Sequence, residues 1–288
     1  MRVTVLGARG QLGHDLVAEL RGCDVTPLTH ADLDVCDADG VRAALRSIRP
    51  HVVINTAAFH RVDECETDPA RAFAVNTFAV RDLARACADR ECVLVHVSTD
   101  YVFGGEKPTP YTEEDAPKPL NVYGVSKLSG EYFVAALCPM HFIVRTSGLY
   151  GLAGASGKGG NFVETMLRLA RAGTPIRVVD DQVLTPTYTA DLAQAIASLI
   201  RTEAFGLYHI NNSGQCSWHR FAATTFELAG LKPELSAITT QAFGATARRP
   251  LFSVLAHKKF ARLTSNWMRP WQEALKAYLR AKGSLARA

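Results

Sequence analysis

The 288-residue sequence lacks long hydrophobic runs, low-complexity tracts and internal repeats. No window approaches the roughly 18 consecutive apolar residues that a membrane span requires, which argues against a membrane protein. No Pro- or Ser-rich run predicts disorder, and no repeat architecture is indicated. We therefore expect an ordered, soluble, cytoplasmic protein with no membrane partner.

Cysteine pairs of the C-x-x-C type are also missing. The seven cysteines are odd in number and scattered along the chain. Structural zinc sites and disulfide frameworks need closely spaced or evenly numbered cysteines, so the pattern predicts reduced packing thiols and no metal.

Acidic residues are scarce near the C-terminus, where residues 243–288 carry ten Lys and Arg against the single acid Glu273. Such a basic segment fits either a phosphorylated small molecule or plain solvated surface. No aromatic-rich stacking motif accompanies it, so we expect no nucleic-acid partner. Self-association as a homodimer is left open by the sequence.

Short apolar runs alternate with helical patterns from residue 2 to about 147. The first run, within MRVTVLGARG, is too short for a signal peptide and predicts a buried strand. The expected strands are 2–6, 24–28, 51–55, 92–98 and 141–146, and the clearest helix is 69–88. This rhythm predicts an α/β fold with a Rossmann-type, doubly wound parallel sheet.

The rhythm changes after Thr146, where residues 148–161 are rich in glycine and predict a mobile loop. Beyond it we expect helices at 161–172, 189–201, 217–229 and 270–281, and strands at 176–179 and 207–210. We therefore expect a dinucleotide-binding portion over 1–147. The remainder, 148–288, is predicted to be a smaller α/β substrate-binding portion that also extends the sheet.

A glycine-rich turn follows the first strand directly, and its residues are Gly7, Ala8, Arg9, Gly10, Gln11, Leu12 and Gly13. Glycines at a strand-to-helix junction allow a pyrophosphate to approach the backbone N–H groups and the positive end of the helix dipole. The position of this motif therefore predicts dinucleotide binding rather than a purely structural turn.

The second strand ends in Leu28-Thr29-His30, without the acidic residue that usually holds the ribose of NADH. Arg9, with His30, is suited to the 2′-phosphate of NADPH, so we favour NADPH. Asp32 and Asp34 keep NADH open, although either could instead cap the helix that begins near Asp37.

A hydroxyl, a phenol and an amine are predicted to meet at the sheet edge. Thr99 ends the strand 92–98, and Tyr123 and Lys127 lie four apart on one helical face. Carbonyl reduction needs a proton donor and a hydrogen-bond donor aimed at the developing oxyanion. We predict Tyr123 as the acid, Lys127 as the cation that lowers its pKa, and Thr99 as the group that polarises the carbonyl.

Several motifs together make the chain resemble the dTDP-4-dehydrorhamnose reductase family of extended short-chain dehydrogenases/reductases. They include Leu33-Asp34-Val35, Asn55-Thr56-Ala57-Ala58-Phe59, Ser98-Thr99-Asp100-Tyr101-Val102-Phe103, Asn121-Val122-Tyr123, Gly160-Asn161-Phe162, Asp181-Gln182, Pro186-Thr187, Gly206-Leu207-Tyr208-His209 and Arg249-Pro250, besides the glycine turn and Lys127.

The resemblance implies NADPH-dependent reduction of the 4-keto group of a dTDP-6-deoxy sugar to dTDP-L-rhamnose, a precursor of cell-wall polysaccharide. It implies cofactor contacts from Gly10 to Leu12 and from Asp34, Val35, Ala57, Ala58 and Phe59, with Tyr123 and Lys127. It also implies substrate contacts from Thr99, Asp100 and Asn161, with Arg249 on the diphosphate. Members of this family commonly carry a Trp where this chain has Gly148, so the identity of the sugar is less firmly implied than the reaction.

Two other functions share these features. A nucleotide-sugar epimerase or dehydratase would use the same fold and the same Tyr and Lys, but it would retain its NAD between turnovers. A non-catalytic, NADP-binding regulatory subunit would share the fold alone. Intact Thr99, Tyr123 and Lys127 favour chemistry over regulation.

Overall fold

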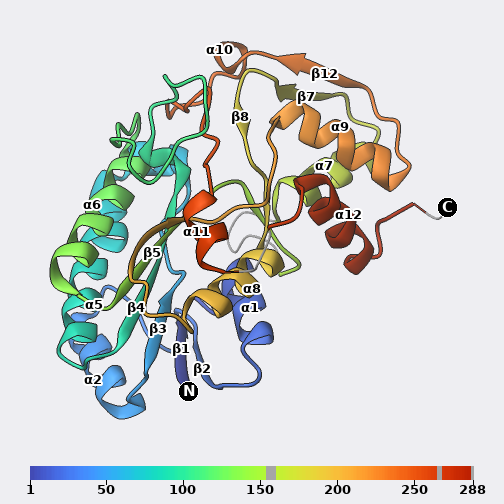
Figure 1. Ribbon diagram of the computed structural model, residues 1–288. Coiled ribbons are helices and arrows are strands. Elements are labelled where there is room, and N and C mark those ends of the chain that lie inside the picture. The colour runs from blue at the N-terminus through green and yellow to red at the C-terminus, as the bar shows by residue number, and fades with distance from the viewer. Residues whose placement is uncertain (154–159, 265–267, 287–288) are drawn as a thin grey trace.

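The computed structural model describes residues 1–153, 160–264 and 268–286. Within them, six parallel strands form one sheet in the order β10-β5-β4-β3-β1-β2. The strands are β1 (Arg2–Leu6), β2 (Asp24–Leu28), β3 (Val52–Asn55), β4 (Val93–Thr99), β5 (His141–Thr146) and β10 (Gly206–His209). The parallel Rossmann-type sheet predicted from the alternating pattern is therefore confirmed (Figure 1).

Helices cover both faces of this sheet, which is why its central strands are apolar on both sides. One face packs against α1 (Gln11–Glu19), α8 (Thr189–Leu199) and α11 (Lys258–Leu263). The other packs against α2 (Ala38–Ile48), α5 (Ala79–Ala88) and α6 (Val122–Leu137), on the left of Figure 1.

The predicted helix at 69–88 is interrupted. It is built from α4 (Pro69–Phe73), a π-helical turn over Ala74–Phe78 and then α5. A π-helical turn inside a helix is a common mark of a functional region, because it rotates one residue out of the regular pattern. Here the turn contains the buried polar residue Asn76.

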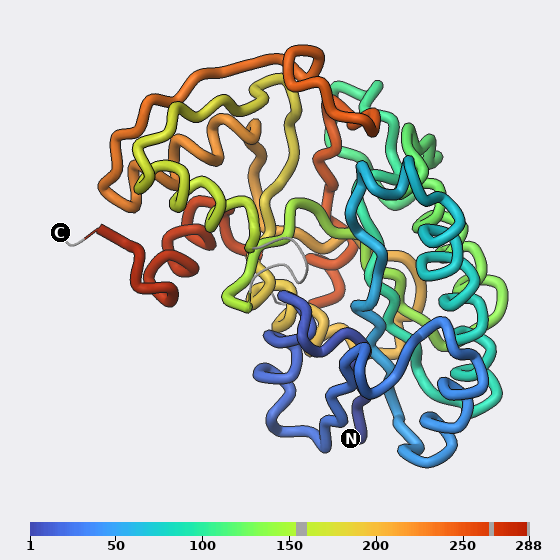
Figure 2. The backbone as a smooth tube through the Cα atoms, turned by 180° about the vertical axis from the view of Figure 1, so that it is seen from behind, coloured from blue at the N-terminus to red at the C-terminus, as the bar shows by residue number. Residues whose placement is uncertain are grey.

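A smaller part lies beyond the carboxyl ends of the large sheet (Figures 1 and 2). Its helices are α7 (Phe162–Arg171), α9 (Trp218–Ala229), α10 (Thr240–Phe243) and α12 (Trp271–Ala281). Its strand pairs are β6 (Leu149–Tyr150) with β9 (Thr187–Tyr188), β7 (Ile176–Val179) with β12 (Leu235–Ile238), and β8 (Val183–Leu184) with β11 (Cys216–Ser217).

The two parts are interleaved along the chain. Strand β10 and helices α8 and α11 come after residue 148 in sequence yet pack on the first part, as the expected sheet extension requires. A short helix, α3 (Val62–Thr67), was not predicted. The loop expected within 148–161 falls largely on residues 154–159, which lie outside the described part of the chain, and the division at 147 stays a prediction.

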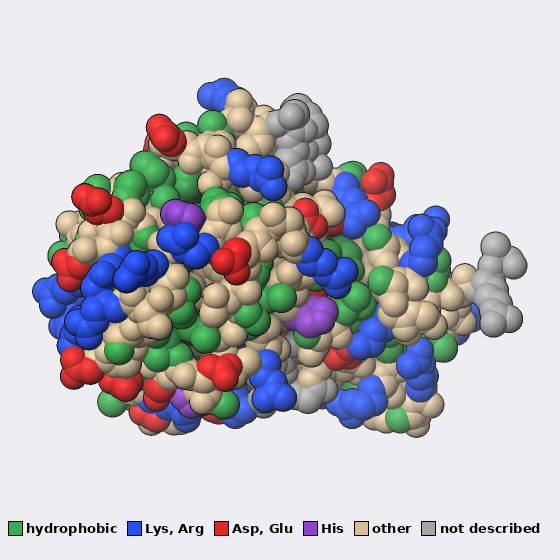
Figure 3. All heavy atoms as spheres, turned by 90° about the horizontal axis from the view of Figure 1, so that it is seen from below, with side chains coloured by type: hydrophobic (Ala, Val, Ile, Leu, Met, Phe, Trp, Pro, Cys, Tyr) green, Lys and Arg blue, Asp and Glu red, His purple; other side chains and the backbone are tan. Residues whose placement is uncertain are grey.

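Two arginines of the basic C-terminal segment form ion pairs with acidic residues elsewhere in the chain. Arg249 pairs with Asp63, and Arg269 pairs with Asp191. On the face shown in Figure 3, side chains of Asp and Glu lie among those of Lys and Arg. Among the described helices, none is both long enough and apolar enough to cross a bilayer.

A buried ion pair joins α6 to β5 beneath the sheet edge. Arg145 donates to both carboxylate oxygens of Glu131, with N–O distances of 2.7–3.1 Å, and both side chains are only 4% exposed. Ser98 on β4 also donates to Glu131, at 2.5 Å. The network therefore fixes α6 against two neighbouring strands.

Removing one partner of this pair should leave an uncompensated buried charge. We expect Glu131→Ala to lower the free energy of unfolding by about 3–5 kcal/mol, measured by urea denaturation. The double variant Glu131→Leu/Arg145→Met, in which neither charge remains, should lose clearly less. A double variant as unstable as the single one would contradict this account.

Candidate active site

A cavity of about 860 Å³ opens at the carboxyl ends of the large sheet, between the two parts of the molecule. This is the edge at which ligands bind in open parallel sheets. The predicted residues that line it are Gly7, Arg9, Gly10, Gln11, Leu12, Asp34, Val35, Ala57, Ala58, Phe59, Thr99, Asp100, Tyr123, Lys127 and Asn161. Gly13 and Arg249 lie outside this lining.

The glycine turn connects β1 to α1 without any side chain at the helix cap, because the cap residue is Gly10. Gly13 lies behind the turn, where a Cβ would be 2.3 Å from the carbonyl oxygen of Gly7. Only glycine permits this close packing of helix on turn. The first-turn N–H groups of α1 are thus left for an anionic ligand, and the turn fits the pyrophosphate of a dinucleotide.

Basic and acidic side chains line the cavity near the end of β2. Arg9, His30 and Asp34 all line it. Asp32 instead folds back on Thr29, accepting hydrogen bonds from its backbone N at 2.9 Å and from its hydroxyl at 2.6 Å. Asp34 accepts from the backbone N of Cys36, while the cap of α2 is Asp37, so neither Asp32 nor Asp34 caps that helix.

The segment after β3 is held by the π-helical turn. The side-chain oxygen of Asn76 accepts from the backbone N of Phe59 at 2.9 Å, and its amide nitrogen donates to the Phe59 carbonyl at 2.9 Å. Asn76 also donates to Ser126 on α6. These bonds fix Phe59, whose ring carries the guanidinium of Arg71 at 4.7 Å from its centroid. Asn76 and Arg71 were not found from the sequence, because they look like ordinary residues of an amphipathic helix.

The predicted catalytic residues converge on the cavity wall. Asn121 caps α6 and so places Tyr123 in its first turn, opposite the end of β4. Tyr123 shares a hydrogen bond with Thr99, which favours the phenolate, but burial has the larger effect and raises the pKa of Tyr123 above its usual value. The lowering of the Tyr123 pKa expected from Lys127 is not seen in this arrangement.

Lys127 is buried at 2% exposure one turn further along α6. Its ammonium donates to the carbonyl of Val97 at 2.7 Å and lies 3.4 Å from the ring nitrogen Nε2 of His96. Burial lowers the pKa of Lys127 to about 8, against the opposing effect of the Glu131 carboxylate.

Asp100 is a buried carboxyl that lines the cavity. It accepts hydrogen bonds from Ser253 at 2.6 Å, Ser147 at 3.0 Å and Thr99 at 3.1 Å. Burial raises its pKa to about 6, although the three hydroxyls act in the opposite direction. The hydrogen bond with this carboxyl therefore orients the side chain of Thr99.

The other two predicted substrate residues have structural partners. Asn161 caps α7 by accepting from the backbone N of Glu164, and it donates to the Gly151 carbonyl and to Tyr278. Arg249 forms a two-point ion pair with Asp63. A direct contact of either side chain with substrate stays a prediction.

The wall beside Gly148 is aliphatic. Gly148 has a positive φ of 54°, and a Cβ there would be 2.7 Å from the terminal carbon Cδ1 of Leu184. Leu184 therefore closes the space beside this position, while Phe162 and Trp218, with ring centroids 4.6 Å apart, line the same cavity. No sequence signal pointed to Leu184, which lies in the two-residue strand β8, or to Trp218, which begins α9 directly after β11.

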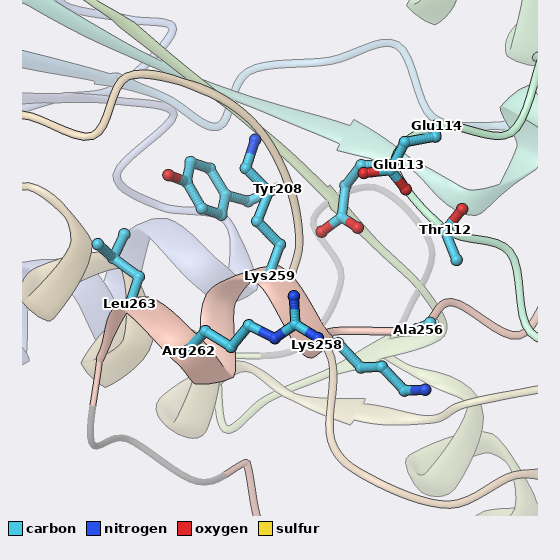
Figure 4. Close-up of a pocket in the computed structure, with 9 residues that line it drawn as sticks. All are labelled: Thr112, Glu113, Glu114, Tyr208, Ala256, Lys258, Lys259, Arg262 and Leu263. Carbon is cyan, nitrogen blue, oxygen red and sulfur yellow. The ribbon is translucent and has the colours of Figure 1, made fainter.

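A second, smaller cavity of about 630 Å³ lies between α11, β10 and the segment 112–114 (Figure 4). Its Lys259 donates to the Leu207 carbonyl and lies over the Tyr208 ring, and its Glu113 accepts from the backbone N of His209. Of the described residues that line it, none is a predicted site residue.

Comparisons with known proteins agree with this geometry. A model of the RmlD substrate binding domain family matches residues 1–283. The chain is 39% identical to the spore coat polysaccharide biosynthesis protein SpsK of Bacillus subtilis, over 98% of each chain. It is 41% identical to a dTDP-4-dehydrorhamnose reductase of Streptomyces griseus, over 95% of this chain and 91% of that protein.

A crystal structure of dTDP-4-dehydrorhamnose reductase from Bacillus anthracis in complex with NADP is similar over nearly the whole fold. Its TM-score is 0.93 at 40% sequence identity, covering 97% of this chain and 99% of that one. Fold, cavity and sequence thus agree, and the chain belongs to the RmlD substrate binding domain family, among the dTDP-4-dehydrorhamnose reductases.

Proposed function

We propose that this protein is an NADPH-dependent oxidoreductase that reduces the 4-keto group of a dTDP-linked 6-deoxy sugar, converting dTDP-4-dehydro-L-rhamnose to dTDP-L-rhamnose. The observation that carries this proposal is that Thr99, Tyr123 and Lys127 line the same cavity as the glycine turn after β1. The family membership and the NADP bound to the similar Bacillus anthracis enzyme support the substrate class and the cofactor. We place the reaction in the cytoplasm, and a homodimer stays an open prediction.

NADPH supplies the hydride when it is bound. The turn residues Gly10 to Leu12 would hold its pyrophosphate at the start of α1, and Ala57, Ala58 and Phe59, which line the same cavity, would contact the rest of the cofactor. Thr99 donates a hydrogen bond to the substrate carbonyl oxygen, and Tyr123 transfers its proton to that oxygen as negative charge develops. Thr99 has a single hydroxyl proton, which is donated to Asp100 in this structure, so the hydroxyl turns from that carboxylate to the sugar oxygen when the substrate binds.

The assay that tests this function measures NADPH oxidation at 340 nm under anaerobic conditions with a panel of dTDP-, GDP- and UDP-linked 4-keto sugars. Consumption of NADPH in proportion to product, with a dTDP sugar preferred, is the expected result. Product formation without net NADPH consumption would instead indicate an epimerase, and binding without product would indicate a regulatory subunit.

Loss of the phenolic hydroxyl should remove the general acid. We expect Tyr123→Phe to lower kcat by about a hundredfold or more while NADPH binding persists. Tyr132→Phe is the matched control, because Tyr132 lies on the same helix but is 61% exposed at the surface. Unchanged turnover in Tyr123→Phe would remove this residue from the mechanism.

The choice between NADPH and NADH should depend on Arg9. Because a guanidinium pairs strongly with a phosphate, Arg9→Ala should raise the KM for NADPH by about tenfold and leave the KM for NADH nearly unchanged. Arg21→Ala, an exposed change in the turn after α1, serves as the control. Equal effects on the two cofactors would show that Arg9 does not contact the 2′-phosphate.

A further inference from the structure

The nitrogen of Lys127 has a buried partner behind it that the proposed reaction does not use. His96, on β4, is completely buried, and its ring nitrogen Nε2 lies 3.4 Å from the Lys127 nitrogen. The other ring nitrogen, Nδ1, lies 3.3 Å from the amide nitrogen of Asn55 at the end of β3. Asn55, His96 and Lys127 therefore form a continuous polar chain under the cavity wall.

A backbone N–H group sets the direction of the hydrogen bonds that link Asn55, His96 and Lys127. The N–H of Ala57 donates to the side-chain oxygen of Asn55 at 3.1 Å, so the amide NH₂ of Asn55 is the end that faces His96. An amide NH₂ can only donate, so Nδ1 of His96 must accept. Burial lowers the pKa of His96 well below its usual value, and the ring is neutral. Its single proton is consequently on Nε2, the nitrogen that faces Lys127.

An N–H group pointing at a lysine nitrogen favours one protonation state. A neutral amine has a lone pair that accepts this hydrogen bond while the amine donates to Val97, whereas an ammonium meets the His96 N–H with another N–H. We propose that Asn55 and His96 are positioning residues that present a hydrogen-bond donor to Lys127 and so keep its extra proton easy to release.

The charged and titratable groups around Lys127 are consistent with this role. From its own helix Glu131 favours the ammonium, but Arg145 on β5 holds both oxygens of that carboxylate. Tyr123 lies one turn before Lys127, and Asp100 follows β4 with its carboxylate bound by three hydroxyls. Burial already lowers the pKa of Lys127 to about 8, in the same direction as the His96 N–H.

The inference rests on the proposed function, in which Tyr123 gives its proton to the sugar oxygen and becomes a phenolate. The ammonium of Lys127 then gives one proton to the phenolate oxygen, directly or through an intervening hydroxyl, and the tyrosine O–H bond is restored. The lysine is left as an amine, whose lone pair accepts from His96 Nε2. A proton from solvent water returns it to the ammonium before the next turnover.

The isosteric variant Asn55→Asp should reverse the direction of the hydrogen bonds that link residue 55, His96 and Lys127. A carboxylate accepts both from the Ala57 N–H and from His96, so the histidine proton moves to Nδ1 and Nε2 becomes an acceptor for the ammonium. Lys127 should then hold its proton more firmly. With the holoenzyme and the dTDP-4-keto sugar, we expect the alkaline limb of kcat/KM to move up by about one pH unit or more.

The negative charge that Asn55→Asp introduces would itself favour the ammonium, so the same substitution is also made in a His96→Phe background. A shift that is large when His96 is present and small in the His96→Phe background supports the proposal. Equal shifts in the two backgrounds would overturn it, because charge alone would then account for the effect. NADPH binding and thermal unfolding of each variant report whether the fold is intact.

The histidine proton is also measured directly, without turnover. In ¹⁵N spectra of the NADPH-bound protein with labelled histidine, the ring signals of His96, assigned by their loss in His96→Phe, should show the Nε2–H form. They should show the Nδ1–H form in Asn55→Asp. An Nδ1–H form in the unsubstituted protein would refute the inference. If no keto sugar is reduced, the proposed function fails whatever the spectra show.

Discussion

Parallel pairing of β3, β4 and β5 is the constraint on which the rest of the structure depends. Because these strands run side by side in one direction, their last residues meet at one edge, and Asn55, Thr99 and Thr146 come from segments far apart in sequence. Helix α6 is locked onto that edge by the Glu131–Arg145 pair. The predicted catalytic side chains are therefore positioned by the sheet and by α6 rather than by any loop.

Burial shifts the pKa values of two ionisable groups at this edge. It raises the pKa of Asp100 to about 6 and lowers that of Lys127 to about 8, so that both pKa values approach neutral pH. Groups with such shifted values exchange protons at ordinary pH, and they are typical of sites where chemistry occurs. The hydroxyls around Asp100 lower its pKa against the effect of burial, and the Glu131 carboxylate raises the pKa of Lys127 in the same opposing way.

The sequence predicted the large sheet well because its strands are continuous apolar runs separated by helical patterns. It also predicted Tyr123 and Lys127 together, because helical spacing places them on one face. It could not predict Leu184 beside Gly148, since two-residue strands such as β8 carry no periodic signal. Nor could it predict that His96 lies behind Lys127: an alternating strand residue looks the same whether it contacts a methyl group or an amine. The predicted lowering of the Tyr123 pKa by Lys127 was wrong for this arrangement, because burial raises that pKa and outweighs the hydrogen bond with Thr99.

The edge strand β10 has a consequence for how the protein can be divided. This strand arrives after residue 205 and pairs along β5 from Phe142 to Arg145. A fragment that stops near residue 147 would leave the backbone N–H and C=O groups on the β10-facing side of β5 without a neighbour, and it would also lose the α8 layer that packs with Val3 and Val5. Such an open, apolar edge invites association between fragments. The large sheet is thus completed only when the chain beyond residue 205 has been synthesised.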